Sequence, residues 1–227
     1  MMKAKFFLIG LLSVFIGCGS WQEGALDRAH KDKLIEVAKR VYDSGLTFGT
    51  GGDISVRVTG TNRFIIKGTG NCLGDLDLQK LATLTLEGEL MEGSPQPSHE
   101  ADIHQAIYQL RESVGAIMHI HSPYATAWAT SGRLIPAVTQ QSVTPLRGIA
   151  IVPYFPVGTQ ELIEAVLDAY QNHDTQVVMM QNHGVFVIGS DLYDILYKGE
   201  VVENTARIAY VCETLGTPVE FEFPELD

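Results

Sequence analysis

The stretch Gly115-Ala116-Ile117-Met118-His119-Ile120-His121-Ser122-Pro123 begins as an apolar, strand-like run and ends with two histidines. In an extended strand successive side chains point to opposite faces, so His119 and His121 share one face. Both imidazoles can then reach one cation, and His183, in the later run Gln-Asn-His-Gly, is a candidate third ligand. Two histidines alone do not hold zinc. Without further ligands, the alternative is a pair of ordinary strand histidines.

The segments on either side of this strand alternate between helical and extended patterns. Helical spacing predicts helices over residues 27–44, 98–109, 123–131, 159–172 and 191–215, with Ser98 and Thr159 as N-caps. Apolar and β-branched runs predict a hairpin of residues 54–58 and 64–67, and strands over residues 81–86, 116–120, 149–152, 176–180 and 185–188. Because helices are interleaved with both a hairpin and single strands, we expect an α/β fold. It would be one three-layer α/β/α domain over residues 25–220, with a mixed, largely antiparallel sheet.

The composition suits a globular protein, since 45% of the 227 residues are hydrophobic. The formal charge of −11 comes from 27 acidic and 16 basic residues, and no Lys/Arg cluster could neutralise a phosphate backbone. We therefore expect no nucleic-acid partner. The cysteines, Cys18, Cys72 and Cys212, fit neither a C-x-x-C metal pattern nor a disulfide framework. A metal would be held by histidine and carboxylate.

The first twenty residues differ from the rest of the chain. Lys3 and Lys5 precede an apolar run over residues 6–16, which is too short for a membrane span of about 20 apolar residues. Ile16-Gly17-Cys18, followed by small residues, resembles a bacterial lipoprotein cleavage box. We expect residues 1–20 to be a signal or lipoprotein leader, with the protein exported or tethered through lipidated Cys18 on the periplasmic side of a membrane. The alternatives are a buried or disordered extension, or a start codon placed too early, in a cytoplasmic protein.

Two other segments supply further candidate ligands. His183 lies between two apolar runs, where Gly184 permits a turn, and taken alone it is better explained as an exposed turn histidine. Glu100 and His104 lie four residues apart on one face of the predicted helix. For His104 we favour a solvated helix face and a supporting position behind the ligands. Glu100 lies in the first turn, and three imidazoles with one carboxylate suit Zn²⁺ or another divalent ion such as Mn²⁺.

As a set, these motifs resemble the class II aldolase/adducin family over nearly all of the chain after the leader. They occur in the family's order and spacing: Gly49-Thr50-Gly51-Gly52-Asp53-Ile54-Ser55-Val56-Arg57, Lys67-Gly68-Thr69-Gly70, Pro97-Ser98-His99-Glu100 with His104, His119-x-His121, and Gln181-Asn182-His183-Gly184. In the family's sugar-phosphate aldolases, the equivalents of Glu100, His119, His121 and His183 surround a zinc ion. The resemblance therefore implies the same four ligands here. It also implies a homo-oligomer, because those enzymes are cyclic tetramers.

The resemblance further implies a lyase that cleaves a carbon–carbon bond in a small, sugar-like hydroxy-carbonyl substrate. A divalent ion would stabilise the enediolate as a Lewis acid, and Glu100 would shuttle the proton. Epimerisation, dehydration and decarboxylation on the same metal site are alternatives. A non-catalytic, adducin-like interaction module is a second alternative, which we disfavour because such members lack the metal ligands that this chain keeps.

The loops expected around the far end of the substrate depart from the family pattern. In the resembling aldolases the equivalents of Thr50, Gly51, Asp53, Thr69, Gly70, Ser98 and His99 bind a phosphate. Asp53 stands where those enzymes have asparagine, and His99 where they often have serine. A carboxylate repels phosphate, whereas a cationic histidine suits a carboxylate or a smaller anion. If the leader is cleaved, a non-phosphorylated substrate fits better, because sugar phosphates are mainly cytosolic. The alternative is that the glycine-rich turn only shapes the backbone and Asp53 caps a turn.

A second departure concerns the acid that protonates the leaving aldehyde. The resembling aldolases use a tyrosine in the segment corresponding to residues 138–141, where this chain has Gln140. Glutamine cannot act as an acid, so either Tyr124 serves or the reaction differs. For Tyr124 we favour packing against the helix that it opens.

Overall fold

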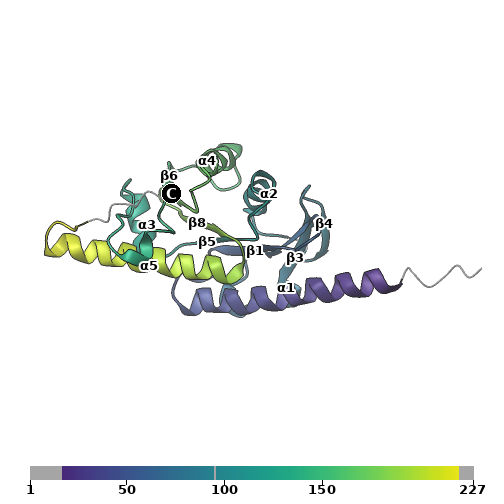
Figure 1. Cartoon of the computed structure of the whole chain (residues 1–227). Coiled ribbons are helices and arrows are strands. Elements are labelled where there is room, and N and C mark those ends of the chain that lie inside the picture. The colour runs from purple at the N-terminus through teal and green to yellow at the C-terminus, as the bar shows by residue number, and fades with distance from the viewer. Residues whose placement is uncertain (1–16, 95, 220–227) are drawn as a thin grey trace, which may run out of the picture.

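The computed structural model describes residues 17–94 and 96–219, and these form three layers around one sheet (Figure 1). The eight strands have the order β4-β3-β2-β1-β5-β8-β7-β6. They are β1 (Asp53–Arg57), β2 (Arg63–Lys67), β3 (Leu81–Thr85), β4 (Leu90–Gly93), β5 (Ala116–Ile120), β6 (Ala150–Val152), β7 (Val177–Met180) and β8 (Gly184–Gly189). Only β6 and β7 pair in parallel, and all other neighbours are antiparallel. The predicted mixed, largely antiparallel sheet is confirmed.

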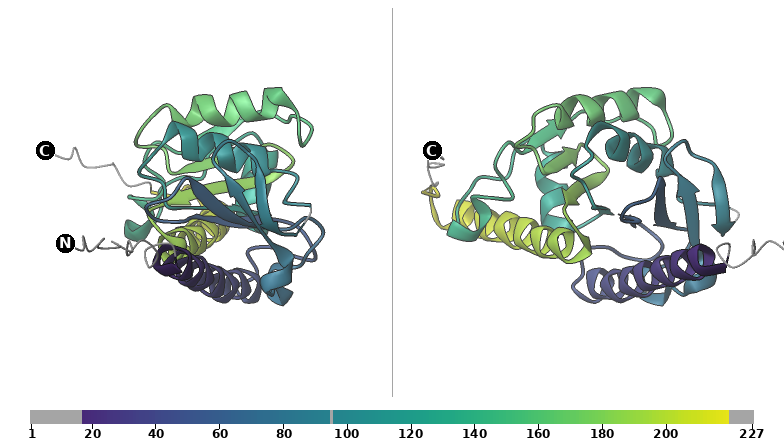
Figure 2. Two further views of the ribbon diagram at one scale, coloured as in Figure 1. Left: turned by 90° about the vertical axis from the view of Figure 1, so that its right-hand side faces the viewer. Right: turned by 45° about the vertical axis from the view of Figure 1, so that its right-hand side comes forward.

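Helices cover both faces of the sheet, as two further views show (Figure 2). One face packs against α1 (Gly17–Asp43), α3 (Pro123–Thr130) and α5 (Leu192–Leu215), and the other against α2 (Ala101–Leu110) and α4 (Gln160–Tyr170). Three short 3-10 helices are η1 (Leu73–Asp75), η2 (Leu78–Lys80) and η3 (Gln140–Ser142). Within the described part of the chain, no helix combines the length and the apolar character that crossing a bilayer requires. The predicted α/β/α layering is confirmed.

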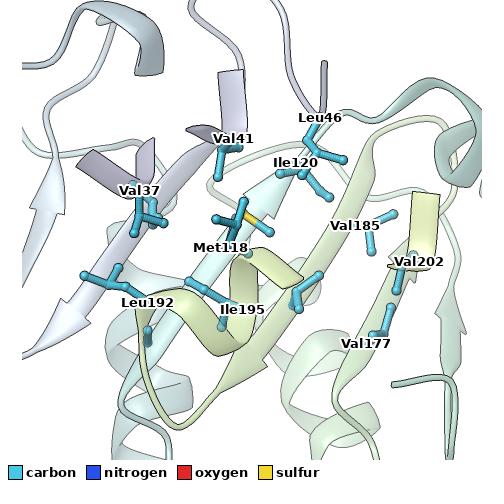
Figure 3. Close-up of a cluster of buried hydrophobic side chains, with 14 of the residues drawn as sticks. Val37, Val41, Leu46, Met118, Ile120, Val177, Val185, Leu192, Ile195 and Val202 are labelled. Atoms are coloured by element: carbon cyan, nitrogen blue, oxygen red, sulfur yellow. The ribbon is translucent and has the colours of Figure 1, made fainter. Parts of the chain in front are cut away.

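The central strand β5 is buried on both faces, which fixes the position of its histidine. Met118 and Ile120 face α1 and α5, where Val37 and Ile195 lie in the same apolar cluster (Figure 3). Ile117 belongs to the opposite cluster, under α2 and α4, and strand alternation puts His119 on that face too. Fully burying an aliphatic side chain of this size stabilises the fold by about 1.5–3 kcal/mol. The face that carries His119 is therefore set by the packing of its neighbours.

Some boundaries differ from the predictions. The first helix begins at Gly17 rather than residue 27, because the prediction followed apolar spacing that starts only further along the chain. The edge strand β4 was not predicted, because all four of its residues are exposed and give no alternating pattern. The N-cap of α2 is Glu100, and the prediction of Ser98 as N-cap was wrong. Of the predicted leader, residues 1–16 lie outside the described residues, so the leader and the 25–220 domain limits stay predictions.

Candidate metal centre

The sheet brings the three histidines together from two neighbouring strands. β5 and β8 pair directly, with Ile120 opposite Val185. His183 ends the three-residue turn between β7 and β8, in which Asn182 has a left-handed φ of 54°, alone among the described non-glycine residues. Gly184 lets this turn approach β5 closely, since a Cβ there would lie 2.4 Å from the Ile120 carbonyl oxygen. The turn therefore delivers His183 to the end of β5, beside His119 and His121.

The side-chain distances define a compact cluster of possible ligand atoms. The Nε2 atoms of His119 and His121 are 2.8 Å apart, and the ring centres of His119 and His183 are 4.8 Å apart. One nitrogen from each of the three rings lies within 4.8 Å of the others. The Glu100 carboxylate joins them, with Oε2 3.3 Å from Nε2 of His119 and Oε1 3.7 Å from Nε2 of His183. All four predicted ligands therefore meet in one place.

This arrangement fits a divalent cation. In a tetrahedral zinc site with bonds of about 2.1 Å, neighbouring ligand atoms lie about 3.4 Å apart, close to the separations in this cluster. Oε1 of Glu100 is buried and has no hydrogen-bond partner among the described residues. A buried carboxylate oxygen without a donor is costly, and a cation would supply the missing partner. Imidazole nitrogen and carboxylate oxygen are also the donor types that suit zinc and similar ions.

The electrostatics of the cluster favour neutral imidazoles. Burial lowers the pKa of His119 well below its usual value, and the neighbouring His121 lowers it further. Burial also lowers the pKa of His121, and burial with the His121 charge lowers the pKa of His183 to about 4. Near neutral pH the three rings are therefore unprotonated, which is the form that binds a metal.

The pKa of Glu100 shifts upward, whereas the pKa values of the three histidines shift downward. Burial, with the nearby Asp53 charge as a second cause, raises the pKa of the Glu100 carboxyl to about 9, although Lys67 acts in the other direction. Without a cation, this carboxyl holds its proton at neutral pH. A group that keeps a proton inside a buried site is suited to acid–base chemistry.

The loop over residues 50–53 lies against the histidines. A Cβ on Gly51 would lie 2.8 Å from Nδ1 of His121, so only glycine leaves room for that ring. Nζ of Lys67 donates to the carbonyl oxygens of Thr50 and Gly52, and these two hydrogen bonds hold the loop in place. Burial lowers the pKa of Lys67, while the Asp53 charge opposes that shift.

Asp53 is buried and hydrogen-bonded within the protein. Its carboxylate is 1% exposed, and it accepts hydrogen bonds from Ser98 Oγ and, at 2.7 Å, from His104 Nε2. Burial opposes the charged form, but the His104 charge and these two hydrogen bonds together lower the pKa of Asp53. Both carboxylate oxygens of Asp53 already accept hydrogen bonds within the protein, and its contact with the substrate stays a prediction. His104 is fully buried, so the prediction of a solvated helix face was wrong.

The remaining predicted residues lie at varied depths. Thr50, Gly70 and His99 are exposed, while Thr69 is half-buried. Gln140 is exposed at the start of η3.

Tyr124 packs toward α5 rather than toward the cluster. Its ring centre is 5.8 Å from that of Tyr210, and the Arg207 guanidinium lies 5.9 Å from its ring. The contacts agree with a packing role for Tyr124, but its partners lie on α5 and not on the helix that it opens.

Two features of the site were missed from the sequence: the support that Lys67 gives to the loop, and the buried link between Asp53 and His104. The available signal was the alternation of polar residues Asp53, Ser55 and Arg57 in an otherwise apolar strand. Such a pattern places three polar side chains on one face of β1, where a buried network has to satisfy them.

Comparison with known proteins identifies the family. Residues 32–210 match the family described as Class II Aldolase and Adducin N-terminal domain. The chain is 32% identical over 183 residues to the L-fuculose phosphate aldolase of Methanococcus maripaludis, covering 81% of this chain and 97% of that one. It is 32% identical over 192 residues to the 3-oxo-tetronate 4-phosphate decarboxylase of Haemophilus influenzae, covering 82% and 90%. A solved L-fuculose 1-phosphate aldolase superposes with a TM-score of 0.79 at 28% identity, covering 86% of this chain and 91% of that one. Motifs, fold and relatives agree, and the chain belongs to the class II aldolase and adducin family.

Proposed function

We propose that this protein is a divalent-metal-dependent lyase that cleaves a carbon–carbon bond in a small hydroxy-carbonyl compound. The observation that supports it most is the convergence of three imidazoles and the Glu100 carboxyl at one place, with His119 and Glu100 buried and His121 and His183 half-buried. Relatives that are aldolases and decarboxylases place the chain among enzymes of the class II aldolase type. An adducin-like module without catalysis has no use for such a cluster.

Each residue has a defined part in this proposal. His119, His121 and His183 would hold the ion, which when bound supplies Lewis-acid stabilisation of negative charge on a substrate oxygen. Glu100, whose Oε2 lies 3.3 Å from Nε2 of His119, would be the fourth ligand and, when a substrate takes its place on the ion, would exchange a proton with that substrate.

We further propose a substrate without a phosphate group. The single hydroxyl proton of Ser98 is donated to Asp53, so that hydroxyl is not free to donate to a phosphate oxygen. The buried Asp53 charge also repels a nearby phosphate. The relatives named above act on phosphorylated compounds, so the direct test is to compare each candidate substrate with its phosphate ester.

Decarboxylation is a second candidate reaction, favoured by Gln140. This residue cannot protonate a leaving aldehyde as the tyrosine of the resembling aldolases does. A decarboxylase is among the relatives at 32% identity. Carbon dioxide release and aldehyde release should therefore be scored separately.

The test has a metal part and an activity part. Purified protein should contain about one zinc, manganese or similar ion per chain by mass spectrometry. His183→Ala should lose that ion, while His173→Ala, which changes an exposed histidine before β7, should keep it. The loaded protein is then screened against hydroxy-aldehydes, hydroxy-acids and their phosphates. Folded, metal-free wild-type protein would refute the proposal.

Two further proposals concern location and assembly. We propose export or lipid anchoring through Cys18, which rests on residues 1–20 and is tested by palmitate labelling of wild-type protein against Cys18→Ser. We also propose a homo-oligomer such as a tetramer, by analogy with the family. A monomer on light scattering would contradict that.

A further inference from the structure

We propose that Asp53 and Ser98 form a positioning pair that holds Glu100 toward the three histidines. Neither residue would touch the ion, and both would act through Glu100. This inference rests on the proposed function, because it takes Glu100 to be a metal ligand.

Ser98 is the link between the pair and Glu100. Its hydroxyl donates to Oδ2 of Asp53 and accepts from the backbone N–H of Glu100, with the nitrogen 3.3 Å from Oγ. Its own backbone N–H donates to the carbonyl oxygen of Lys67 at 2.9 Å, and its carbonyl accepts from Ala101 at 3.0 Å. Ser98 therefore connects β1, β2 and the first turn of α2, and a shift of Ser98 would shift Glu100.

The Glu100 side chain has one close polar contact, with Nε2 of His119, and its backbone is held by Ser98 on one side and by the N–H groups of Ile103 and His104, which donate to its carbonyl, on the other. Glu100 is the N-cap of α2, with φ −104° and ψ 13°, yet its side chain makes no capping hydrogen bond. Its Oε1 atom is without a hydrogen-bond partner in the described part of the chain. The direction of the carboxylate is therefore decided mainly by where the backbone of residue 100 is held.

Asp53 in turn is anchored to the core by a line of buried side chains. His104 lies 2.7 Å from Asp53 and, through Nδ1, 2.7 Å from Oγ of Ser55, which is 2.8 Å from the Tyr108 hydroxyl. All four residues are almost completely buried. A carboxylate only accepts, so His104 donates through Nε2, and Asp53 receives both this bond and the one from Ser98. The two carboxylate oxygens serve one donor each.

The need for two acceptors explains why aspartate fits this position better than asparagine. Asparagine has the same shape but offers one acceptor oxygen and an NH₂ donor. With its oxygen accepting from His104, the asparagine would present its NH₂ group to Ser98, whose hydroxyl would have to rotate and accept. Asp53→Asn therefore replaces a charge-assisted hydrogen bond by a weaker neutral one and loosens the link to Glu100 without opening a cavity.

The test is a double-mutant cycle on the full chain, read by competition for zinc with a chromophoric chelator. Asp53→Asn should weaken zinc affinity by about 10–100-fold, the usual effect of disturbing a residue behind a metal ligand. Asp53→Asn combined with Glu100→Gln should bind no more weakly than Glu100→Gln alone. Additive losses would overturn the proposal, because Asp53 would then act through another route.

Two additional variants test the linking hydroxyl directly and separate a loss of positioning from a general loss of stability. Ser98→Ala removes only the linking hydroxyl and should weaken zinc binding in the same way; unchanged affinity would overturn the pair. Thr159→Ala removes the cap of α4, whose Oγ1 accepts from the N–H of Leu162, and should lower stability without changing zinc affinity. If Thr159→Ala weakened zinc binding equally, the losses would report stability rather than positioning, and the proposal would fail.

A spectroscopic readout separates positioning from general damage. The visible spectrum of Co²⁺-loaded protein responds to the ligand set and its geometry. The Asp53→Asn spectrum should move toward that of Glu100→Gln, and a spectrum identical to the wild type would count against the pair. Wild-type protein that binds neither ion would overturn the proposed function together with this inference, whereas normal binding with an additive cycle would overturn the inference alone.

Discussion

Gly184→Ala should damage both the fold and the metal centre, because the added methyl group has no space. A Cβ at this position would lie 2.4 Å from the Ile120 carbonyl oxygen, 2.7 Å from Cδ2 of His121 and 2.9 Å from Cε1 of His119. The nearest of these atoms is backbone in the central strand and cannot turn aside. The start of β8 must therefore shift away from β5, and the two imidazole rings, which are two of the four proposed ligands, must move as well.

The magnitude follows from two opposing effects. Replacing glycine lowers the entropy of the unfolded chain and stabilises by about 0.4–1 kcal/mol, whereas overpacking a core costs about 1–3 kcal/mol. The net loss of unfolding free energy is then about 1–2 kcal/mol, or about 2–8 °C in Tm for a chain of this length. Displacing two histidines should also weaken zinc binding by at least about tenfold, which corresponds to about 1.4 kcal/mol.

Gly199→Ala is the matched control. Its Cβ would lie 2.5 Å from Cε of Met118, the end of a flexible side chain that can move away. Gly199 is inside α5, where alanine is favoured by about 1 kcal/mol, so the Tm should change little and zinc affinity should not change. Thermal unfolding with chelator present and zinc competition measure the two effects separately. A Gly184→Ala protein with wild-type Tm and wild-type zinc affinity would refute the close approach of β8 to the two rings.

Three further predictions concern other parts of the molecule. The Glu203 carboxylate accepts from the backbone N–H groups of Tyr124 and Ala125 at the start of α3, so Glu203→Ala should cost about 0.5–2 kcal/mol in urea unfolding, and an unchanged midpoint would show that this cap is not needed. Lys67→Met leaves two carbonyl groups of the loop over residues 50–52 without their donor, at a cost of about 1–3 kcal/mol, and amide hydrogen exchange in that loop should accelerate; the same exchange rates as in the wild type would contradict its role. If zinc is bound as proposed, raising free zinc to a thousand times its Kd should add about 4 kcal/mol of stability, or about 8–16 °C in Tm, and a Tm that ignores both zinc and chelator would argue against the site.

Much of the fold could be predicted because many helices and strands are marked by the residues of their own segment. β5 was predicted with its observed bounds, since an apolar run between Gly115 and His121 leaves little choice. Thr159 was predicted as a cap and does accept from the N–H of Leu162. β4 could not be predicted, because an exposed edge strand such as Leu90–Gly93 depends on pairing with β3 rather than on its own pattern.

The candidate site was predictable only in part. The period of a strand put His119 and His121 on one face, and the family motifs added Glu100 and His183. The burial of Asp53 could not be predicted, because it depends on α2 folding across that face of the sheet and bringing His104 with it. Ser98 looked like a cap for the same reason: its real acceptor, Asp53, is 45 residues away in sequence.

The buried line from Asp53 to Tyr108 also constrains how the sheet can assemble. Asp53 lies directly opposite His119 in the pairing of β1 with β5. A slip of one residue between these strands would turn the Asp53 side chain to the other face, among the apolar residues under α1 and α5. An uncompensated carboxylate buried there costs about 3–5 kcal/mol, which is comparable to much of the stability of a typical domain. The polar line from Asp53 to Tyr108 therefore specifies the register of β1 against β5. A shifted pairing that the apolar residues alone would accept is destabilised by the buried carboxylate.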